Sequence, residues 1–165
     1  MDYVLRRATD DDADFLTGML VEAADWRHPP DTPGRAERAL ADERVRRYVS
    51  DWRRPGDLGV IAVDAAGTPI GAAWSRLFTA GVAAFGFVAA DVPELAIGVR
   101  ADRRGLGVGR ALLAALLDTA TAAGFRRISL SVDHDNPAAA LYRATGFTVV
   151  ESRATAATMV RALTP

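Results

Sequence analysis

The sequence has no cysteine and no lysine. Without cysteine the chain can form no disulfide, no thiolate metal site and no cysteine-based covalent intermediate. A reducing cytoplasm is the simplest compartment for such a chain, so we expect a cytoplasmic protein. Without lysine a Walker phosphate-binding loop is excluded, because that loop requires lysine before its serine or threonine.

Strong net charge and long hydrophobic runs are also missing. The 20 basic residues, all arginine, and the 21 acidic residues leave a formal net charge of −1. Such a chain has no global field to draw it onto nucleic acid or an anionic membrane, and we expect most arginines on solvated faces. No apolar run approaches the ~20 residues of a membrane span, and the N-terminal residues lack a secretory signal pattern. We therefore expect neither a nucleic-acid nor a membrane partner.

The remaining pattern fits one domain, residues 1–165. Thr9 followed by three aspartates predicts a helix that ends near Asp25, because the hydroxyl can cap it and acidic residues suit its positive end. Thr32 and Pro33 predict the cap and first residue of a second helix, which should continue past Val49 and end at "RRPGD". Further helices are expected at about 107–123 and 137–145, and strands at 3–7, 58–64, 69–78, 94–100, 127–132, 147–150 and 157–163.

The order of these elements predicts one mixed α/β sheet covered by helices, with an antiparallel hairpin at "AAGT". Residues 79–93 are rich in glycine and alanine but contain phenylalanine, so we expect an apolar loop that walls a pocket. Most aromatic side chains should be core, and some should line an acceptor pocket; the candidates are Trp26, Trp52, Trp74, Phe78, Phe85 and Phe87.

The most informative stretch is "ELAIGVRADRRGLGVGRALLAALL", residues 94–117. It passes from a strand, through three glycines at alternate positions, into a leucine-rich helix. Backbone N–H groups at a helix start are unpaired and lie at the positive end of the helix dipole, which favours phosphate. Glycines remove the Cβ atoms that would hold an anion away from these amides. The stretch therefore predicts a phosphate site.

Spacing separates the remaining phosphate-binding patterns. A dinucleotide fingerprint, G-x-G-x-x-G, would need a glycine where the chain has Arg110. The chain instead has Arg104-x-x-Gly107-x-Gly109, with an extra Gly105. This stretch resembles the pyrophosphate signature of the GNAT superfamily of N-acetyltransferases. The "ELAIGV" strand, "LSVDHDNPAAALYRATGF" and the strand order extend the resemblance over about 58–150.

The resemblance implies a mostly antiparallel twisted sheet of about six or seven strands, flanked by about four helices. It also implies that two parallel central strands splay apart around acetyl-CoA, the cosubstrate. Backbone amides of the glycine loop would hold the pyrophosphate, and the central strand would offer backbone groups to the pantetheine and thioester. The expected cofactor-binding residues are Ile97, Val99, Arg104, Gly105, Gly107, Val108, Gly109, Arg110 and Asn136. Asn136 can equally be a helix cap before Pro137.

The resemblance also implies two residues for proton transfer. Tyr142 matches the family's tyrosine, and a phenol of pKa ~10 can return a proton to a leaving thiolate whose conjugate acid has a pKa of ~8.5. Glu94, which starts the central strand, is the first candidate for the base, and Asp91 is the second. In a regular pleat Glu94 shares a face with Ala96 and Gly98, whereas the bulge usual in this family would alter that parity.

The expected function is transfer of acetyl from acetyl-CoA to a small-molecule or peptide amine by direct attack in a ternary complex. Transfer of a longer acyl group, and CoA binding by a sensor without turnover, are the alternatives. His134 lies between two aspartates, but the only other histidine is His28, so we expect neither a metal site nor a catalytic triad. No motif identifies the acceptor. Family members often dimerise, so a homodimer is a further expectation.

Overall fold

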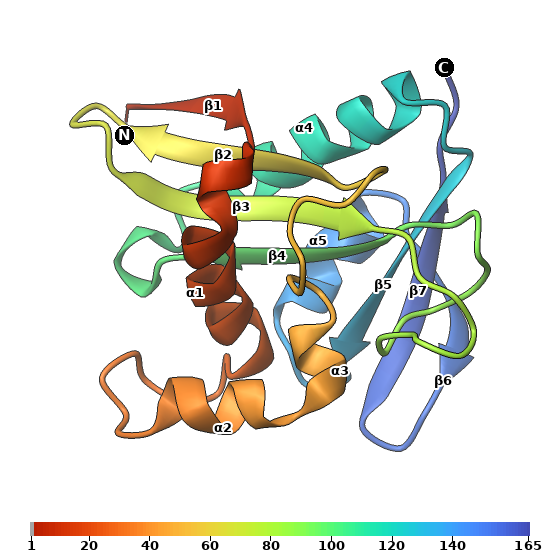
Figure 1. Ribbon diagram of the computed structural model, residues 1–165, viewed down its shortest axis with the longest axis horizontal. Coiled ribbons are helices and arrows are strands. Elements are labelled where there is room, and N and C mark those ends of the chain that lie inside the picture. The colour runs from red at the N-terminus through yellow and green to blue at the C-terminus, as the bar shows by residue number, and fades with distance from the viewer. Residues whose placement is uncertain (1) are drawn as a thin grey trace.

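The computed structural model describes residues 2–165, which form a seven-stranded sheet with helices on both faces (Figure 1). The strand order is β1-β2-β3-β4-β5-β7-β6, and every neighbouring pair is antiparallel except β4 and β5. This confirms the expected mixed, mostly antiparallel sheet. The strands are β1 Tyr3–Arg7, β2 Leu58–Asp64, β3 Pro69–Arg76, β4 Glu94–Val99, β5 Arg127–Asp133, β6 Thr148–Ser152 and β7 Ala156–Ala162.

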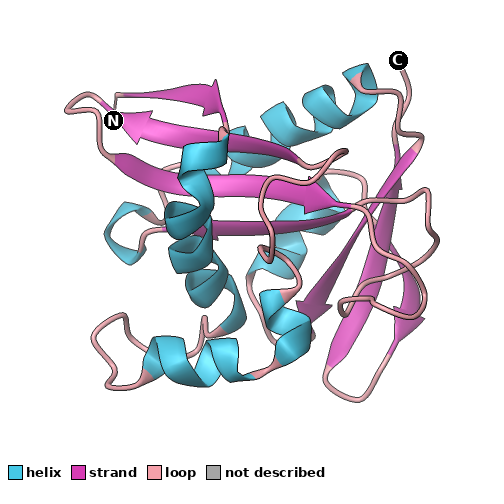
Figure 2. Ribbon diagram, viewed as in Figure 1, coloured by secondary structure: helices cyan, strands magenta, loops and turns pink. Residues whose placement is uncertain are grey.

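Helices cover the two faces of the sheet unequally. In the view of Figure 2, α1 crosses in front of β2, β3 and β4, α2 and α3 lie below these strands, and α4 and α5 lie behind the sheet. The helices are α1 Ala13–Ala24, α2 Arg35–Ala41, α3 Glu43–Arg46, α4 Val108–Ala122 and α5 Ala138–Ala144, with 3-10 turns η1 Asp10–Asp12 and η2 Ala101–Arg103. No helix within residues 2–165 is long and apolar enough to cross a bilayer.

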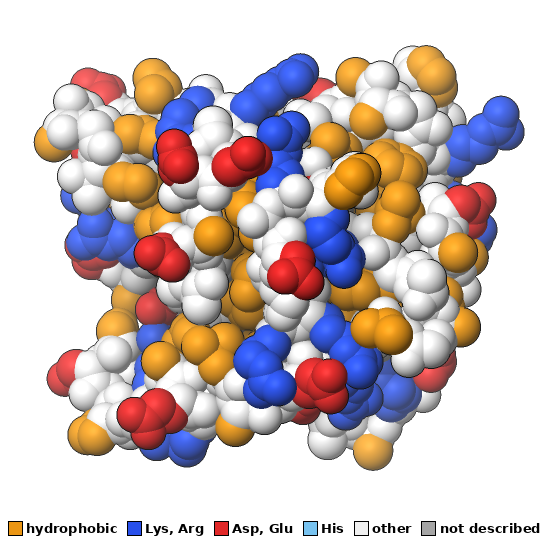
Figure 3. Space-filling model, in the orientation of Figure 1, with side chains coloured by type: hydrophobic (Ala, Val, Ile, Leu, Met, Phe, Trp, Pro, Cys, Tyr) orange, Lys and Arg blue, Asp and Glu red, His pale blue; other side chains and the backbone are white. Residues whose placement is uncertain are grey.

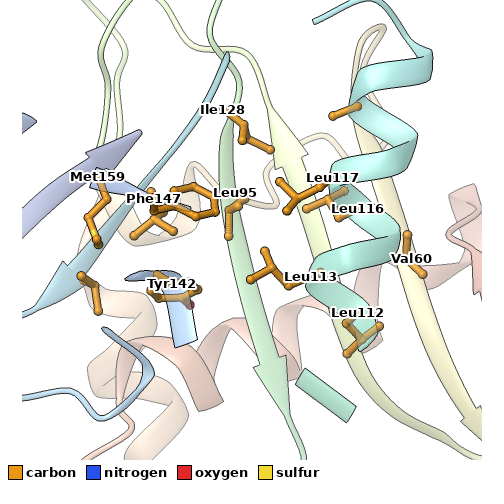
Figure 4. Packing of buried hydrophobic residues seen from close by; sticks show 14 of the residues in the cluster. Val60, Leu95, Leu112, Leu113, Leu116, Leu117, Ile128, Tyr142, Phe147 and Met159 are labelled. Atoms are coloured by element: carbon orange, nitrogen blue, oxygen red, sulfur yellow. The ribbon is translucent and has the colours of Figure 1, made fainter. Parts of the chain in front are cut away.

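The main hydrophobic core lies between the sheet and α4. Leucines on one side of α4 point toward strand residues such as Val60, Leu95 and Ile128 (Figure 4). This packing follows from helical geometry, because residues three and four apart share one face. The leucines are Leu112, Leu113, Leu116 and Leu117. A second core on the opposite face joins α1 to the sheet through Leu16, Leu20, Ile61 and Trp74.

The two central strands, β4 and β5, separate soon after they meet. Their pairing is limited to Glu94 beside Ser129, where the Ser129 N–H donates to the Pro93 carbonyl at 2.9 Å. Along their remaining length β4 pairs only with β3, and β5 pairs only with β7. The backbone edge of β4 that faces β5 therefore has no strand partner beyond its first residues.

The expected second helix is wrong in its start and its continuity. Gly34, with φ 70°, precedes the first residue of α2, Arg35, so Thr32 and Pro33 lie in the turn before the helix. The helical segment then breaks at Asp42, whose side chain accepts a hydrogen bond from the Arg44 N–H at 2.8 Å and caps α3. A short acidic side chain that binds a backbone amide competes with the helix itself, which explains the break.

Candidate active site

A cavity of about 1140 Å³ lies where β4 and β5 diverge. It is lined by Leu95–Val99 of β4 and Leu130–Asp133 of β5. The rest of its wall comes from the start of α4, the end of α1, α3, α5 and the turn before β7. The cavity therefore joins the glycine loop to Tyr142, two features that the sequence separates by about thirty residues.

The glycine loop gives α4 an open N-terminus. Gly107 precedes the helix with φ 85°, a left-handed conformation that glycine adopts without strain, and Gly105 has φ 74°. The first helical hydrogen bond comes from the Ala111 N–H to the Gly107 carbonyl at 3.1 Å, and no side chain caps the helix. The N–H groups of residues 108–110 therefore lack helical partners. A Cβ added at Gly107 would meet no atom within 4 Å, so the space beside these amides is open.

Most of the expected pyrophosphate residues border the cavity. Arg104, Gly105, Val108 and Gly109 line it. Gly107 and Arg110 do not line the cavity; Gly107 lies between lining residues Gly105 and Val108, and the exposed Arg110 contributes only its backbone amide to the helix start. The structure thus brings the glycine loop and two of its arginines, Arg103 and Arg104, to the cavity.

Arg104 is engaged by the protein itself. Its Nη2 donates to Glu22 Oε2 of α1 at 2.7 Å, and its Nε donates to the Val99 carbonyl at 3.3 Å. Arg104 therefore ties the loop to α1 and occupies a carbonyl that we expected to serve the pantetheine. A carbonyl oxygen can accept two hydrogen bonds and, among residues 2–165, the Val99 N–H has no such contact, so the expectation that Val99 offers backbone groups to the pantetheine stays a prediction.

The open edge of β4 is regular. The pairing of β3 with β4 runs without a break from Arg76 opposite Glu94 to Gly71 opposite Val99, so the bulge usual in the family is absent here. Because Pro93 directs its carbonyl to β5, the alternation of a strand directs the backbone groups of Ile97 and Val99 the same way. These groups face the cavity, which both residues line.

Tyr142 and Asn136 reach the cavity from α5 and the turn before it. Tyr142 is 6% exposed, its ring packs edge-on to Phe147 at 5.9 Å, and burial raises the pKa of its phenol. Within residues 2–165 its hydroxyl has no hydrogen-bond partner. Asn136 Oδ1 accepts the Ala138 N–H at 2.9 Å, so the capping contact that we considered is present. Asn136 also lines the cavity, and the two roles are therefore compatible.

Glu94 is almost fully buried, with 1% of its surface exposed. The Tyr48 hydroxyl and the Gly86 N–H, the latter at 3.0 Å, both donate to its Oε2. Burial raises the pKa of Glu94 to about 7, although both hydrogen bonds act in the opposite direction. Glu94 does not line the cavity, whereas Tyr48 does. Asp91, the second candidate for the base, lies exposed outside the cavity lining.

The loop of residues 79–93 approaches β5 so closely that only glycine fits at position 86. A Cβ at Gly86 would lie 2.6 Å from the Leu130 backbone. The Ser129 hydroxyl donates to the Gly86 carbonyl at 2.8 Å and holds the loop in place. This contact brings the Gly86 N–H to Glu94 and neighbouring Phe85 to the cavity wall, which confirms that the loop walls a pocket.

Arginine and aromatic side chains surround the cavity near α3. Arg44 stacks on Phe85 with its Cζ 4.3 Å from the ring centroid, and both residues line the cavity. Figure 3 shows several arginine side chains gathered around the position of α3. Trp26 lines the cavity and donates to Asp133 Oδ2 at 2.9 Å, whereas Trp74 is core. The aromatic candidates therefore divide into wall and core.

His134 is an exposed loop residue. Its Nε2 lies 2.7 Å from the Arg153 carbonyl, so it joins the turn after β5 to the turn before β7. Among residues 2–165, no group of three or more histidine, cysteine or acidic side chains is placed to hold a metal ion.

Sequence reasoning missed three residues of the site: Tyr48, Gly86 and Arg153. Arg153 lines the cavity and donates to Thr158 Oγ1 at 2.6 Å and Ser131 Oγ at 3.0 Å. Tyr48 lies in the turn after α3 and follows Val45 by three residues, so helical spacing offered a signal that it lies on the same apolar side as Val45. Its contact with Glu94 was not predictable from spacing, because 46 residues separate the two.

Known proteins resemble this chain over most of its length. Among curated proteins, the mycothiol acetyltransferase of Clavibacter michiganensis is 37% identical over 140 residues, which are 84% of this chain and 40% of that protein. The mycothiol acetyltransferase of an Arthrobacter species is 31% identical and covers 81% of this chain and 41% of its own length. The chain thus spans about two fifths of the curated relatives it matches.

Solved structures share the fold. A phosphinothricin acetyltransferase of Sinorhizobium meliloti, solved in complex with AcCoA, superposes with a TM-score of 0.64 at 28% identity, covering 99% of this chain and 89% of that one. A GCN5-related N-acetyltransferase of Kribbella flavida gives 0.65 at 26% identity, covering 98% of each chain. The family model of the acetyltransferase (GNAT) family matches residues 20–147. The chain belongs to the acetyltransferase (GNAT) family.

Proposed function

We propose that this chain transfers an acetyl group from acetyl-CoA to an amine by direct attack. One observation carries the proposal: a single cavity joins the uncapped start of α4 to the unpaired edge of β4 and to Tyr142. An open helix N-terminus suits a pyrophosphate, and an unpaired strand edge suits an extended amide chain. Acetyl-CoA carries both groups, with a thioester at the far end of its amide arm.

In this proposal the backbone amides of residues 105–110 hold the pyrophosphate, and Val108 and Gly109 let it approach the helix start. The backbone groups of Ile97 and the N–H of Val99 pair with the pantetheine amides or polarise the thioester oxygen. Arg104 supports the loop through Glu22 and Val99. The Asn136 side-chain nitrogen, which the capping contact leaves available, donates a hydrogen bond to the pantetheine arm of the cofactor.

The chemistry requires two proton movements. The amine nitrogen forms a bond to the thioester carbon, and the bond from that carbon to sulfur then breaks. Tyr142, which lines the cavity, supplies a proton to the leaving thiolate, and because burial raises the pKa of its phenol, the phenolate takes a proton back at once from solvent. Glu94 is the final acceptor of the amine proton, because burial brings its pKa near neutrality.

The acceptor is proposed only as a small molecule with a primary amine. The matching relatives are named mycothiol acetyltransferases, and one structural neighbour is a phosphinothricin acetyltransferase, so related chains act on small molecules. A longer acyl donor and a sensor without turnover are the competing proposals. A sensor would bind acetyl-CoA but release no thiol with any amine.

Calorimetry and a thiol assay test the proposal together. We expect acetyl-CoA and CoA to bind to the protein and NAD not to bind. With acetyl-CoA present, a panel of amines should include one that releases free CoA thiol in proportion to acetylated product. Binding of NAD without binding of CoA would contradict the proposed cofactor, and CoA binding without turnover on any amine would favour the sensor.

A further inference from the structure

We propose that Tyr48 is a second proton-transfer residue, which carries the amine proton from the cavity to Glu94. The inference rests on the proposed acetyl transfer. It begins from an obstacle: Glu94 is buried and does not line the cavity, so an amine in the cavity lacks a direct path to its carboxylate. Tyr48 lines the cavity and its hydroxyl donates to Glu94 Oε2. The phenol therefore connects the two.

Tyr48 is held firmly in this position. The Trp74 indole donates to the Tyr48 carbonyl at 2.9 Å, and the Tyr48 ring packs edge-on to Phe78 with centroids 5.9 Å apart. Buried Arg76 donates to the carbonyls of Arg47 and Ser50, at 2.9 and 2.6 Å, on either side of Tyr48. Contacts with its ring and with the backbone around it thus fix the phenol between the cavity and the carboxylate.

The carboxylate is equipped to receive a proton. Its Oε2 already accepts from Tyr48 and Gly86, whereas Oε1 is buried without a partner among residues 2–165. An ionised carboxylate is costly in such surroundings, and protonation removes that cost. Neutralisation of Glu94 is therefore favourable as the amine attacks.

Few charges oppose or assist this transfer. The group facing Glu94 from the turn after α3 is Tyr48, and the group from the loop 79–93 is the Gly86 amide. From the turn before β7, the charge of Arg153 favours the ionised form of both Glu94 and Tyr48. Arg76 lies opposite Glu94 on β3 but forms its ion pair with Asp57 at 2.7 Å. The surroundings thus leave the proton on Tyr48 until the amine arrives.

The transfer is a concerted relay. Burial and the Glu94 charge raise the pKa of Tyr48 well above its usual value, so a free phenolate is disfavoured. As the nitrogen bonds to the thioester carbon, an N–H bond breaks and its proton passes to the Tyr48 oxygen. The original Tyr48 proton passes to Glu94 Oε2 at the same time. Tyr48 ends neutral and Glu94 ends protonated, so charges and protons balance.

Tyr48→Phe tests the relay, with Tyr3→Phe as the matched control. Tyr48→Phe removes only the hydroxyl and keeps the ring beside Phe78, whereas Tyr3 lies on β1, away from the cavity. We expect kcat/KM for the acetylated amine to fall ~10²-fold in Tyr48→Phe and to stay unchanged in Tyr3→Phe. The acetyl-CoA dissociation constant should stay unchanged in both. Glu94→Gln alone and the double variant Tyr48→Phe with Glu94→Gln should have equally low kcat/KM, because loss of either group stops the whole relay.

The pH profile separates a relay from mere positioning. The acidic limb of the kcat/KM profile should move to higher pH in Tyr48→Phe. The lost hydrogen bond stabilises ionised Glu94, so its removal raises the pKa of Glu94. If Tyr48 is a relay, kcat/KM of Tyr48→Phe on the pH-independent plateau above that limb should stay ~10²-fold below the parent value. Recovery of the parent kcat/KM on the plateau would overturn the relay. It would also be overturned if the loss in the double variant equalled the product of the two single-variant fold-losses. A parent that binds no acetyl-CoA or acetylates no amine would instead contradict the proposed function.

Discussion

At the scale of single residues, the site depends on polar groups placed in apolar surroundings. Glu94 and Tyr142 were expected from the resemblance; the structure places Tyr142 in the cavity lining and Glu94 at the start of β4, buried outside that lining. The contact of Glu94 with Tyr48 was beyond sequence reasoning, because it needs the turn after α3, β4 and the loop 79–93 folded together. Local spacing carries information about faces of one element and little about contacts between elements.

Glu94→Gln should stabilise the protein in a pH-dependent way. The folded pKa of about 7 exceeds the usual 4.5, so the contribution of Glu94 to stability is fully present below pH 4.5 and is lost as pH rises through 7. Glutamine does not titrate. As pH rises between these limits, the free energy of unfolding of the variant should therefore increase by ~2–3 kcal/mol relative to that of the parent. Urea unfolding at pH 4.5 and pH 8 measures the difference. An equal difference at both pH values would show that Glu94 is not shifted in the folded state.

Tyr142→Phe should slow turnover without weakening the cofactor. The variant keeps the ring contact with Phe147 and removes only the hydroxyl, so we expect stability close to that of the parent. Turnover should fall ~10²-fold if the phenol protonates the thiolate. Steady-state kinetics and acetyl-CoA calorimetry check the two parts. A parental rate would remove Tyr142 from the mechanism.

At the scale of elements, buried ion pairs hold the turns that carry the site. Most arginines were expected on solvated faces, yet Arg76 is 0% exposed and binds Asp57 through two hydrogen bonds of 3.0 and 2.7 Å. Its position at the end of a strand gave no sign of burial. The expected strands match the structure closely, whereas the second helix fails at Asp42, because side-chain capping there competes with helix periodicity.

Arg76→Met should destabilise the fold by ~3–5 kcal/mol, because it leaves Asp57 charged and buried. It also removes the donors that hold the carbonyls beside Tyr48. The double variant Arg76→Met with Asp57→Leu should regain much of the loss, because it leaves no unpaired charge. Thermal and urea unfolding compare the two. A double variant less stable than the single one would contradict a charge-based penalty.

At the scale of the whole molecule, the divergence of β4 and β5 creates the cavity between two separate cores. Sheet and helices were predictable from hydrophobic patterning, but the divergence came from the family resemblance alone. Each strand keeps a partner on its other side, β3 beside β4 and β7 beside β5, so the sheet persists while the facing edges of β4 and β5 separate. The residue pattern of a single strand therefore does not predict where that strand separates from its neighbour.

The direct test of this account is the affinity for acetyl-CoA of two matched glycine variants. Gly107 and Gly67 have φ values of 85° and 84°, and an added Cβ at either meets no atom within 4 Å. Aspartate at either position therefore carries a similar backbone cost of ~1–2 kcal/mol. Only Gly107 lies at the start of α4, where the phosphates are proposed to bind; Gly67 lies in the turn between β2 and β3.

Calorimetry should show that Gly67→Asp binds acetyl-CoA like the parent and that Gly107→Asp loses detectable binding. Equal acetyl-CoA affinity in both variants and the parent would contradict the placement of the pyrophosphate at the start of α4.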